Sequence, residues 1–163
     1  MRKAALLTIS DRCSTGERQD RSGPLLRDML RSEGYNVAHY EILPDEQDLI
    51  ALRLRQLADE YSVDLVVTTG GTGLSPRDVT PEATTAAVDR LVPGIAEAMR
   101  SASLVKTRHA MLSRAVAGVR GQTLIINLPG SERAARENLQ VVLPALSHAI
   151  DKIQGDPAEC GSV

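Results

Sequence analysis

Short apolar runs alternate with longer amphipathic segments along this chain, and no other sequence feature constrains the fold as much. The runs at residues 3–9, 36–43 and 64–69 have the length of strands, and the last is apolar on both faces, as central parallel strands tend to be. The segments 24–32 and 46–61 carry apolar residues at helical spacing. Alternating strands and helices predict an α/β domain with a mostly parallel sheet and right-handed crossovers.

The second half of the chain continues the alternation and adds a hairpin. Helices are expected at 81–88 and from 93 to about 104, while residues 106–115 fit neither pattern. Residues 117–127 indicate a hairpin with Arg120-Gly121 at its turn, so one strand should be antiparallel. The predicted fold is therefore a three-layer sandwich, with helices on both faces of a mostly parallel sheet that has one antiparallel strand.

Capping residues predict where several helices begin and end. Ser22, Thr80 and Ser131 each precede a helical segment, where a side-chain oxygen can accept from the free N–H groups of the first turn. The last helix, after Ser131, should reach about residue 154. Gly34 follows the first helical segment and suits its carboxyl end.

Length and composition fit one domain at residues 1–154 followed by a polar tail at 155–163. No charged leader followed by a long apolar stretch begins the chain, so we expect a cytoplasmic protein that does not enter a membrane. The net charge of −2, and three Tyr with no Phe or Trp, argue against a nucleic-acid partner, which selects basic surfaces and aromatic stacking platforms. We expect Cys13 and Cys160 to be unpaired thiols.

Polar motifs follow the predicted strands at the points where those strands end. They are Ser10-Asp11, Asp45-Glu46, the turn Gly70-Gly71-Thr72-Gly73, and Asn127-Leu128-Pro129-Gly130-Ser131. The carboxyl ends of parallel strands share one edge of a sheet, which is where open α/β sheets bind ligands. We therefore expect these motifs to meet at one cleft.

The glycine turn at residues 70–73 has two possible roles. It can bring backbone N–H groups close to an anion, or it can simply reverse the chain. It lacks the Lys of a P-loop and the spacing of a dinucleotide fingerprint. Arg77 and Asp78 follow directly, before an expected helix start, and helix N-termini favour phosphate. This context favours phosphate binding.

Asp45 and Asp78 are both expected beside that phosphate site, where a carboxylate repels the ligand unless a cation lies between them. Mg²⁺ bound by one or two carboxylates and the phosphates of ATP meets this need. Alternatives remain: Asp45 suits a helix N-cap, Asp78 a turn or salt bridge, and Asp11 a turn or cap. No metal-ligand cluster of His or Cys and no covalent-nucleophile motif appears in the sequence. That fits attack on ATP by a phosphate monoester, which is already anionic and needs alignment and charge neutralisation more than a base.

These motifs resemble, in order and rough spacing, those of the MogA/MoaB family of molybdenum cofactor biosynthesis. The segments that carry the likeness are 8–12, 19–24, 42–46, 69–84, 112–114 and 127–131. The likeness covers nearly the whole chain, from about Ala4 to about Ile150.

The resemblance implies an ATP- and Mg²⁺-dependent nucleotidyltransferase that moves AMP from ATP to the phosphate of molybdopterin and releases pyrophosphate. It also implies a homotrimer and a downstream molybdate-inserting protein as a partner. Asp45 and Asp78 would be the catalytic and metal-binding carboxylates. The nucleotide and molybdopterin would be bound by Ser10, Asp11, Gly70, Gly71, Thr72, Gly73, Ser113, Asn127, Pro129, Gly130 and Ser131. Some MoaB-type members keep the fold as molybdopterin-binding or scaffold proteins without this activity. The intact segments 44–46 and 77–81 favour the active enzyme.

Overall fold

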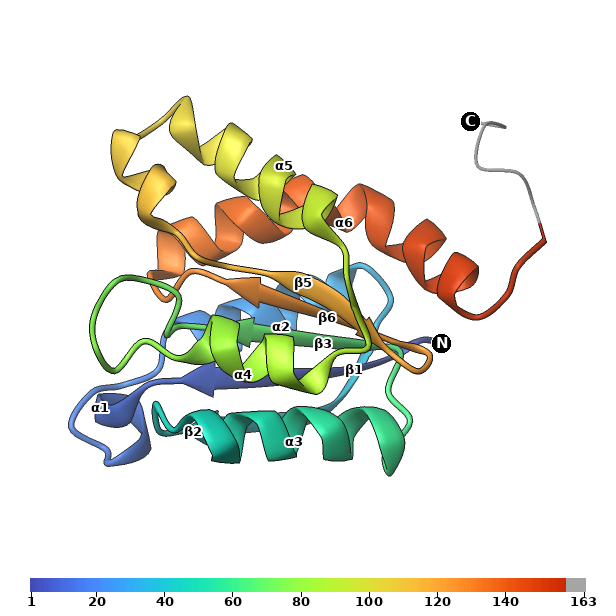
Figure 1. The fold of residues 1–163 in the computed structure, drawn as a ribbon, viewed down its shortest axis with the longest axis horizontal. Coiled ribbons are helices and arrows are strands. Elements are labelled where there is room, and N and C mark those ends of the chain that lie inside the picture. Colours follow the sequence, from blue (N-terminus) through green and yellow to red (C-terminus); the bar gives the residue numbers. More distant parts are fainter. Residues whose placement is uncertain (158–163) are drawn as a thin grey trace.

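A mixed sheet forms the centre of the molecule, and within residues 1–157, which this computed structural model describes, it has six strands (Figure 1). They are β1 (Lys3–Ile9), β2 (Asn36–Leu43), β3 (Leu65–Thr69), β4 (Arg90–Leu91), β5 (Ala117–Arg120) and β6 (Thr123–Leu128). The spatial order is β2-β1-β3-β6-β5-β4. Strands β2, β1, β3 and β6 pair in parallel, and β5 runs antiparallel to both of its neighbours. The prediction of a mostly parallel sheet with one antiparallel strand is confirmed.

Helices cover both faces of this sheet, which gives the predicted three layers (Figure 1). One face packs against α2 (Ser22–Ser32), α5 (Pro93–Leu104) and α6 (Glu132–Ile153). The other packs against α3 (Gln47–Asp59) and α4 (Thr80–Ala87). No helix in the described part of the chain is long and apolar enough to cross a membrane.

Two aliphatic clusters, one on each face, hold the layers together. Strand β3 shows why both are needed: Leu65 and Val67 pack under α2, α5 and α6, whereas Val66 packs under α3 and α4. All three side chains are completely buried. Complete burial of such a side chain contributes about 1.5–3 kcal/mol, so the central strand anchors both helical layers.

Two of the predicted caps are wrong. Helix α2 begins at Ser22 itself, after Arg21 at the N-cap, and the Ser22 hydroxyl donates to Gly130 O at 2.9 Å. Helix α4 likewise begins at Thr80, whose hydroxyl donates to Gly70 O at 2.9 Å. Neither hydroxyl caps its own helix: Ser22 bonds to a distant loop, and Thr80 bonds to the start of the loop that precedes α4.

The remaining boundaries follow the prediction more closely, apart from the shortest elements. Ser131 caps α6, because its hydroxyl oxygen accepts from Ala134 N at 3.2 Å. Gly34 follows the end of α2 with φ at +83°. Helix α1 (Asp11–Ser14), strand β4 and the 3-10 helix η1 (Arg108–Leu112) were not predicted. Most of the tail expected at 155–163, including Cys160, lies outside the described residues.

Candidate active site

A cavity of about 490 Å³ opens where the parallel strands end; we call it the aspartate cavity. Segments from β1, β2, β3 and β6 contribute to it, together with Asp78 from the loop before α4. The predicted residues that line it are Ser10, Asp45, Gly70, Gly71, Asp78, Gly130 and Ser131. The structure therefore brings together residues that are more than 100 positions apart, and it places both aspartates in one cavity.

Main-chain contacts hold the strand-end loops against one another. Gly70 has φ at +101°, and a Cβ there would overlap Ile9 O. A Cβ on Gly130 would stand 3.2 Å from Gly70 Cα. The Thr69 hydroxyl donates to Pro129 O at 2.7 Å, and Gly70 N donates to Leu128 O at 3.1 Å. Glycine is needed at 70 because both its φ and its closeness to β1 exclude a side chain.

Asp45 is fixed by a reciprocal pair of hydrogen bonds with Asp11. Asp11 N donates to Asp45 Oδ2 at 2.9 Å, and Asp45 N donates to Asp11 Oδ1 at 3.0 Å. Helix α3 has Glu46 at its N-cap, without a side-chain cap bond, so the N-cap alternative for Asp45 is wrong. Asp45 Oδ1 accepts no hydrogen bond from the described residues, and it lies 3.0 Å from where a Cβ on Gly71 would stand.

Asp78 combines a turn role with a place in the cavity. Its Oδ2 accepts from Ser75 N at 2.9 Å, and Asp78 N donates back to Ser75 O at 2.9 Å. The turn that the sequence suggested for Asp78 therefore exists. The same residue lines the aspartate cavity, and no described residue donates to its Oδ1.

The charges around Asp45 favour a cation. The pKa of Asp45 is raised, first by burial and then by the nearby charges of Asp11 and Asp78. The hydrogen bond from Asp11 N and the charge of Arg77 act in the opposite direction. The paired guanidinium of Arg77, whose Nη2 donates to Asp11 Oδ1 at 2.9 Å, lowers the pKa of Asp11. An ionised Asp45 beside Asp78 is therefore stabilised by a positive charge between them.

The donor set suits a divalent cation that is shared with a ligand. Among the described residues, no group of three or more His, Cys, Asp or Glu could hold a metal. Two carboxylates nevertheless line one cavity, each with an oxygen free of protein hydrogen bonds. Mg²⁺ commonly uses one or two carboxylates, with substrate phosphates and water completing the octahedron. The residues present therefore fit Mg²⁺ when a polyphosphate is bound, and they do not form a cage for the metal alone.

Two arginines and a helix end bring positive potential to the same cavity. Arg18 and Arg21, from the segment between α1 and α2, line it, as does the start of α6 at Ser131. The N-terminus of a helix as long as α6 attracts anions. Asp20 and Glu132 line the cavity as well, so it combines cationic groups with carboxylates.

Asp20 holds the segment that carries these arginines. Its Oδ1 accepts from Gly23 N at 2.9 Å, and its Oδ2 accepts from the Tyr40 hydroxyl at 2.5 Å. Burial, followed by this bond to Asp20, raises the pKa of Tyr40 to about 12. Tyr40 is consequently a neutral donor at physiological pH and ties the segment to β2.

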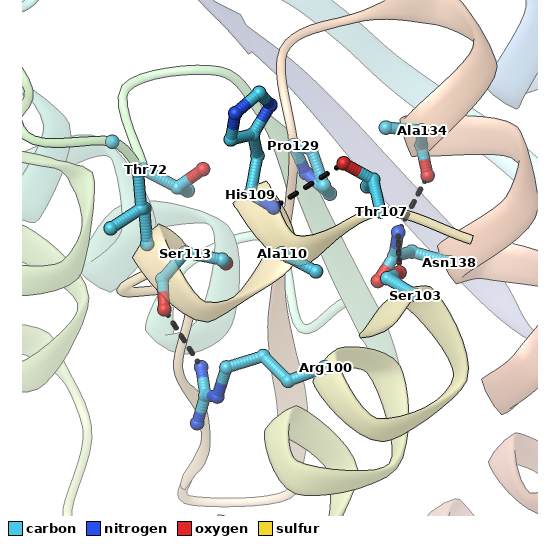
Figure 2. A pocket seen from close by; sticks show the side chains of 12 residues that line it. Thr72, Arg100, Ser103, Thr107, His109, Ala110, Ser113, Pro129, Ala134 and Asn138 are labelled. Carbon is cyan, nitrogen blue, oxygen red and sulfur yellow. Dashed lines mark hydrogen bonds between the residues drawn. The ribbon is translucent and has the colours of Figure 1, made fainter. Parts of the chain in front are cut away.

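A second cavity of about 270 Å³ is lined in part by the same strand-end loops (Figure 2). We call it the apolar cavity, after its mostly apolar lining. Polar groups stand at intervals around it. Asn138 Nδ2 donates to Ser103 Oγ at 3.1 Å and to Ala134 O at 2.7 Å, and Arg100 donates to Ser113 O at 3.3 Å. Figure 2 shows Arg100, Thr107 and Asn138 around the space.

The single predicted cleft is therefore two cavities whose linings share no residue. Thr72, Gly73, Ser113 and Pro129 line the apolar cavity, whereas residues 69–71 and 130–131 line the aspartate cavity. Consecutive residues of the same two loops thus face different cavities. Sequence reasoning brought the loops to one edge, but it could not show that their residues divide between two cavities.

Asn127 and Asp11 support the site from outside both cavities. Asn127 is completely buried and lines neither, which corrects its predicted place in the pocket. Its Nδ2 donates to the hydroxyls of Thr68 at 3.0 Å and Thr84 at 2.9 Å. The amide therefore joins β6 to β3 and α4. Asp11 lines neither cavity, and it braces Asp45 as described above.

Arg114 contributes to the site although the sequence pattern gave no reason to select it. Its Nε donates to Gly73 O at 2.8 Å and its Nη2 to Asp78 O at 2.7 Å, while Nη1 pairs with Glu82. The segment 106–115 has no clear periodicity, and backbone carbonyls leave no mark in a sequence. The only available signal was its place in the motif at residues 112–114.

Comparisons with known proteins agree with these observations. Residues 5–148 match a family described as probable molybdopterin binding domain. Over 153 residues the chain is 46% identical to a molybdopterin adenylyltransferase of Helicobacter pylori strain J99, which covers 93% of this chain and 87% of that protein. The molybdopterin adenylyltransferase of Escherichia coli K12 is 44% identical over 150 residues, covering 91% of this chain and 77% of its own. The crystal structure of the molybdopterin biosynthesis enzyme MoaB from Thermus thermophilus superimposes with a TM-score of 0.90 at 52% identity, covering 98% of this chain and 100% of that one.

Proposed function

This chain belongs to the family of probable molybdopterin binding domains, and from that premise we propose that it transfers AMP from ATP to the phosphate of molybdopterin. A phosphate oxygen of molybdopterin attacks the α-phosphorus of ATP, the bond from that phosphorus to the bridging oxygen breaks, and pyrophosphate leaves. The observation that supports this proposal most directly is the aspartate cavity at the ends of the parallel strands. Its lining includes Asp45, Asp78, Arg18 and Arg21.

The chain's own groups suit the charges of this reaction. Asp45 and Asp78 would hold Mg²⁺, which supplies neutralisation of the triphosphate when it is bound. Arg18, Arg21 and the first turn of α6 attract the phosphates. No side-chain base is required, because a phosphate monoester is ionised at neutral pH, and alignment with charge stabilisation accounts for most catalysis of phosphoryl-type transfers.

The pair of cavities suits substrates whose rings and phosphates occupy different spaces, with the reacting phosphates together in the aspartate cavity. The aspartate cavity is polar and fits phosphates, whereas the apolar cavity fits a flat heterocycle such as adenine or the pterin. Ser103, Asn138 and Thr107 supply polar groups around that space for the ring's donors and acceptors. Pockets of this kind, mostly apolar with a few placed polar groups, are typical of small-molecule sites.

Pyrophosphate release tests the proposal. Purified protein with ATP, Mg²⁺ and molybdopterin should release pyrophosphate, and Asp78→Ala should lower kcat on the order of 10³-fold. Asp28→Ala is the matched control, because Asp28 is exposed on α2 and pairs with Arg27. Full activity in Asp78→Ala would exclude the metal role. Binding of molybdopterin by the wild type without turnover would instead identify a carrier or scaffold protein.

We also propose a cytoplasmic homotrimer that delivers its product to a molybdate-inserting protein. Exposed apolar side chains at the end of α5 and in η1 support subunit contacts: Leu104 is 44%, Val105 89% and Met111 63% exposed. Exposed apolar groups that cluster in this way are often interfaces. Sedimentation of the wild type against Val105→Asp tests this, and a monomeric wild type would contradict it.

A further inference from the structure

Arg114 directs its guanidinium at the loop that carries Asp78 and at the first turn of α4. The side chain, 34% exposed, extends from the segment between η1 and β5. Nε donates to Gly73 O at 2.8 Å, Nη2 donates to Asp78 O at 2.7 Å, and Nη1 pairs with Glu82. The backbone N–H of Arg114 donates to Thr72 O at 2.9 Å. One residue therefore contacts the glycine turn, the end of the following loop and the first turn of α4.

These contacts fix both ends of the loop with one planar group. Gly73 begins the loop and Asp78 ends it, and inside it Ser75 and Asp78 exchange two hydrogen bonds of 2.9 Å. Glu82 holds the guanidinium from α4, and its own pKa is lowered by that bond. The position of the Asp78 carboxylate therefore depends on Arg114, although the two side chains share no hydrogen bond.

The same residue lies where the two cavities meet. Gly73 and Ser113, the neighbour of Arg114 in the chain, line the apolar cavity, while Asp78 lines the aspartate cavity. Arg114 itself lines neither. It touches backbone that belongs to both, and a shift on one side is therefore transmitted to the other through a rigid group.

We propose that Arg114 is a positioning residue that couples the cavities, so that a heterocycle bound against Gly73 and Ser113 fixes the place of Asp78 for the transfer step. This inference rests on the proposed function for its catalytic consequence. Its structural part, that Arg114 holds the loop from Gly73 to Asp78 in place, does not depend on that function. A brace that only supported the fold would lower stability without linking the two sites.

Kinetics of Arg114→Gln and Arg114→Lys test the catalytic part. We expect Arg114→Gln to lower kcat by about 10²-fold, as a misplacement of about 1 Å does, with little change in the KM for ATP. Lys should restore part of the rate, because it can hold one carbonyl but not several. The matched control is Arg120→Gln, since Arg120 is 24% exposed at the other end of β5 and holds Asp59 and Ala87 O. Its kcat should stay near that of the wild type.

A double-mutant cycle separates positioning of Asp78 from a general effect. In an Asp78→Asn background, Arg114→Gln should lower kcat by less than about 3-fold, because the group it positions is already lost. Equal losses of kcat in both backgrounds would overturn the proposal. So would an equal loss in Arg120→Gln.

Amide hydrogen exchange at Ser75, Arg77 and Asp78 provides a readout that does not need turnover. Molybdopterin alone should slow exchange of this loop at least about 10-fold in the wild type and leave it unchanged in Arg114→Gln. Arg114→Lys serves if the Gln variant does not fold. A wild type that releases no pyrophosphate but shows this protection would refute the proposed function and retain the coupling. An equal response of the loop in wild type and variant would refute the coupling.

Discussion

Replacing Gly70 with Ala should damage both stability and catalysis, and the structure gives the size of each effect. Gly70 has φ at +101°, and its Cβ would overlap Ile9 O, well inside the 3.0 Å that real Cβ atoms keep. Ile9 is the last residue of β1, and the next residues lead to Asp11, which holds Asp45. A shift at this point is therefore passed to one of the proposed catalytic carboxylates.

The cost of Gly70→Ala has two parts. A left-handed backbone conformation costs an L-residue about 1–2 kcal/mol, and forcing an extra methyl into packed surroundings costs about 1–3 kcal/mol more. We expect the free energy of unfolding to fall by about 2–5 kcal/mol. The strand end or the turn must also move by about 1 Å, which should lower kcat about 10²-fold.

Gly34→Ala isolates the first part of that cost. Gly34 also has a positive φ, at +83°, but nothing lies within 4 Å of its Cβ position. This variant should lose about 1–2 kcal/mol and keep its kcat. Urea unfolding gives the stabilities, and pyrophosphate release gives the rates. If Gly70→Ala unfolds at the same urea concentration as Gly34→Ala and retains wild-type kcat, our account of the β1–β3 contact is refuted.

Three further variants probe other parts of the site and fold. Because the pKa of Asp45 is raised, its ionisation lowers the stability of the ligand-free protein as pH rises through that pKa. Asp45→Asn should therefore raise the melting temperature at neutral pH without ligand. The same variant should abolish Mg²⁺-dependent ATP binding, which in the wild type weakens as pH falls. Arg120 lowers the pKa of Asp59, so the pair stabilises the fold above the ordinary carboxylate pKa. This stabilisation is lost as pH falls through the lowered pKa. Arg120→Gln should therefore make the free energy of unfolding depend less on pH in the acid range. Tyr40→Phe removes the hydroxyl that donates to Asp20 Oδ2. It should raise the KM for ATP several-fold, about the effect of one hydrogen bond, and leave kcat nearly unchanged. An unchanged KM would show that Asp20 holds its segment without the phenol.

The layers of the fold are predictable because burial leaves a periodic trace. Leu65, Val66 and Val67 are consecutive apolar residues, which is typical of a strand covered on both sides, and the structure buries all three completely. The hairpin followed from Arg120-Gly121 in the same way, because a turn residue between two apolar runs marks the reversal. Convergence of the strand-end loops then followed from the parallel sheet alone.

Partners that are distant in the sequence could not be predicted. The hydroxyl of Ser22 looked like a cap, but it donates to the carbonyl of Gly130, and nothing local distinguishes the two uses. Arg114 acts on carbonyls 36–41 positions away, which depends on tertiary structure.

Asn127 shows a second limit, which concerns the direction of a side chain. A polar residue near a strand end can face a ligand or the interior. The choice here depended on two hydroxyls, those of Thr68 and Thr84, which together receive the amide of Asn127 inside the core. The resemblance to a family supplied the motif but not the orientation within it.

The division of the strand-end loops between two cavities has an evolutionary consequence. No residue lines both chambers, so a substitution within one lining alters that chamber directly and reaches the other only through the loops and Arg114 that connect them. Related proteins can therefore change which heterocycle they bind, while the residues that transfer the phosphate group are selected separately. Glycines at the boundary are the exception, since any change there alters both chambers at once.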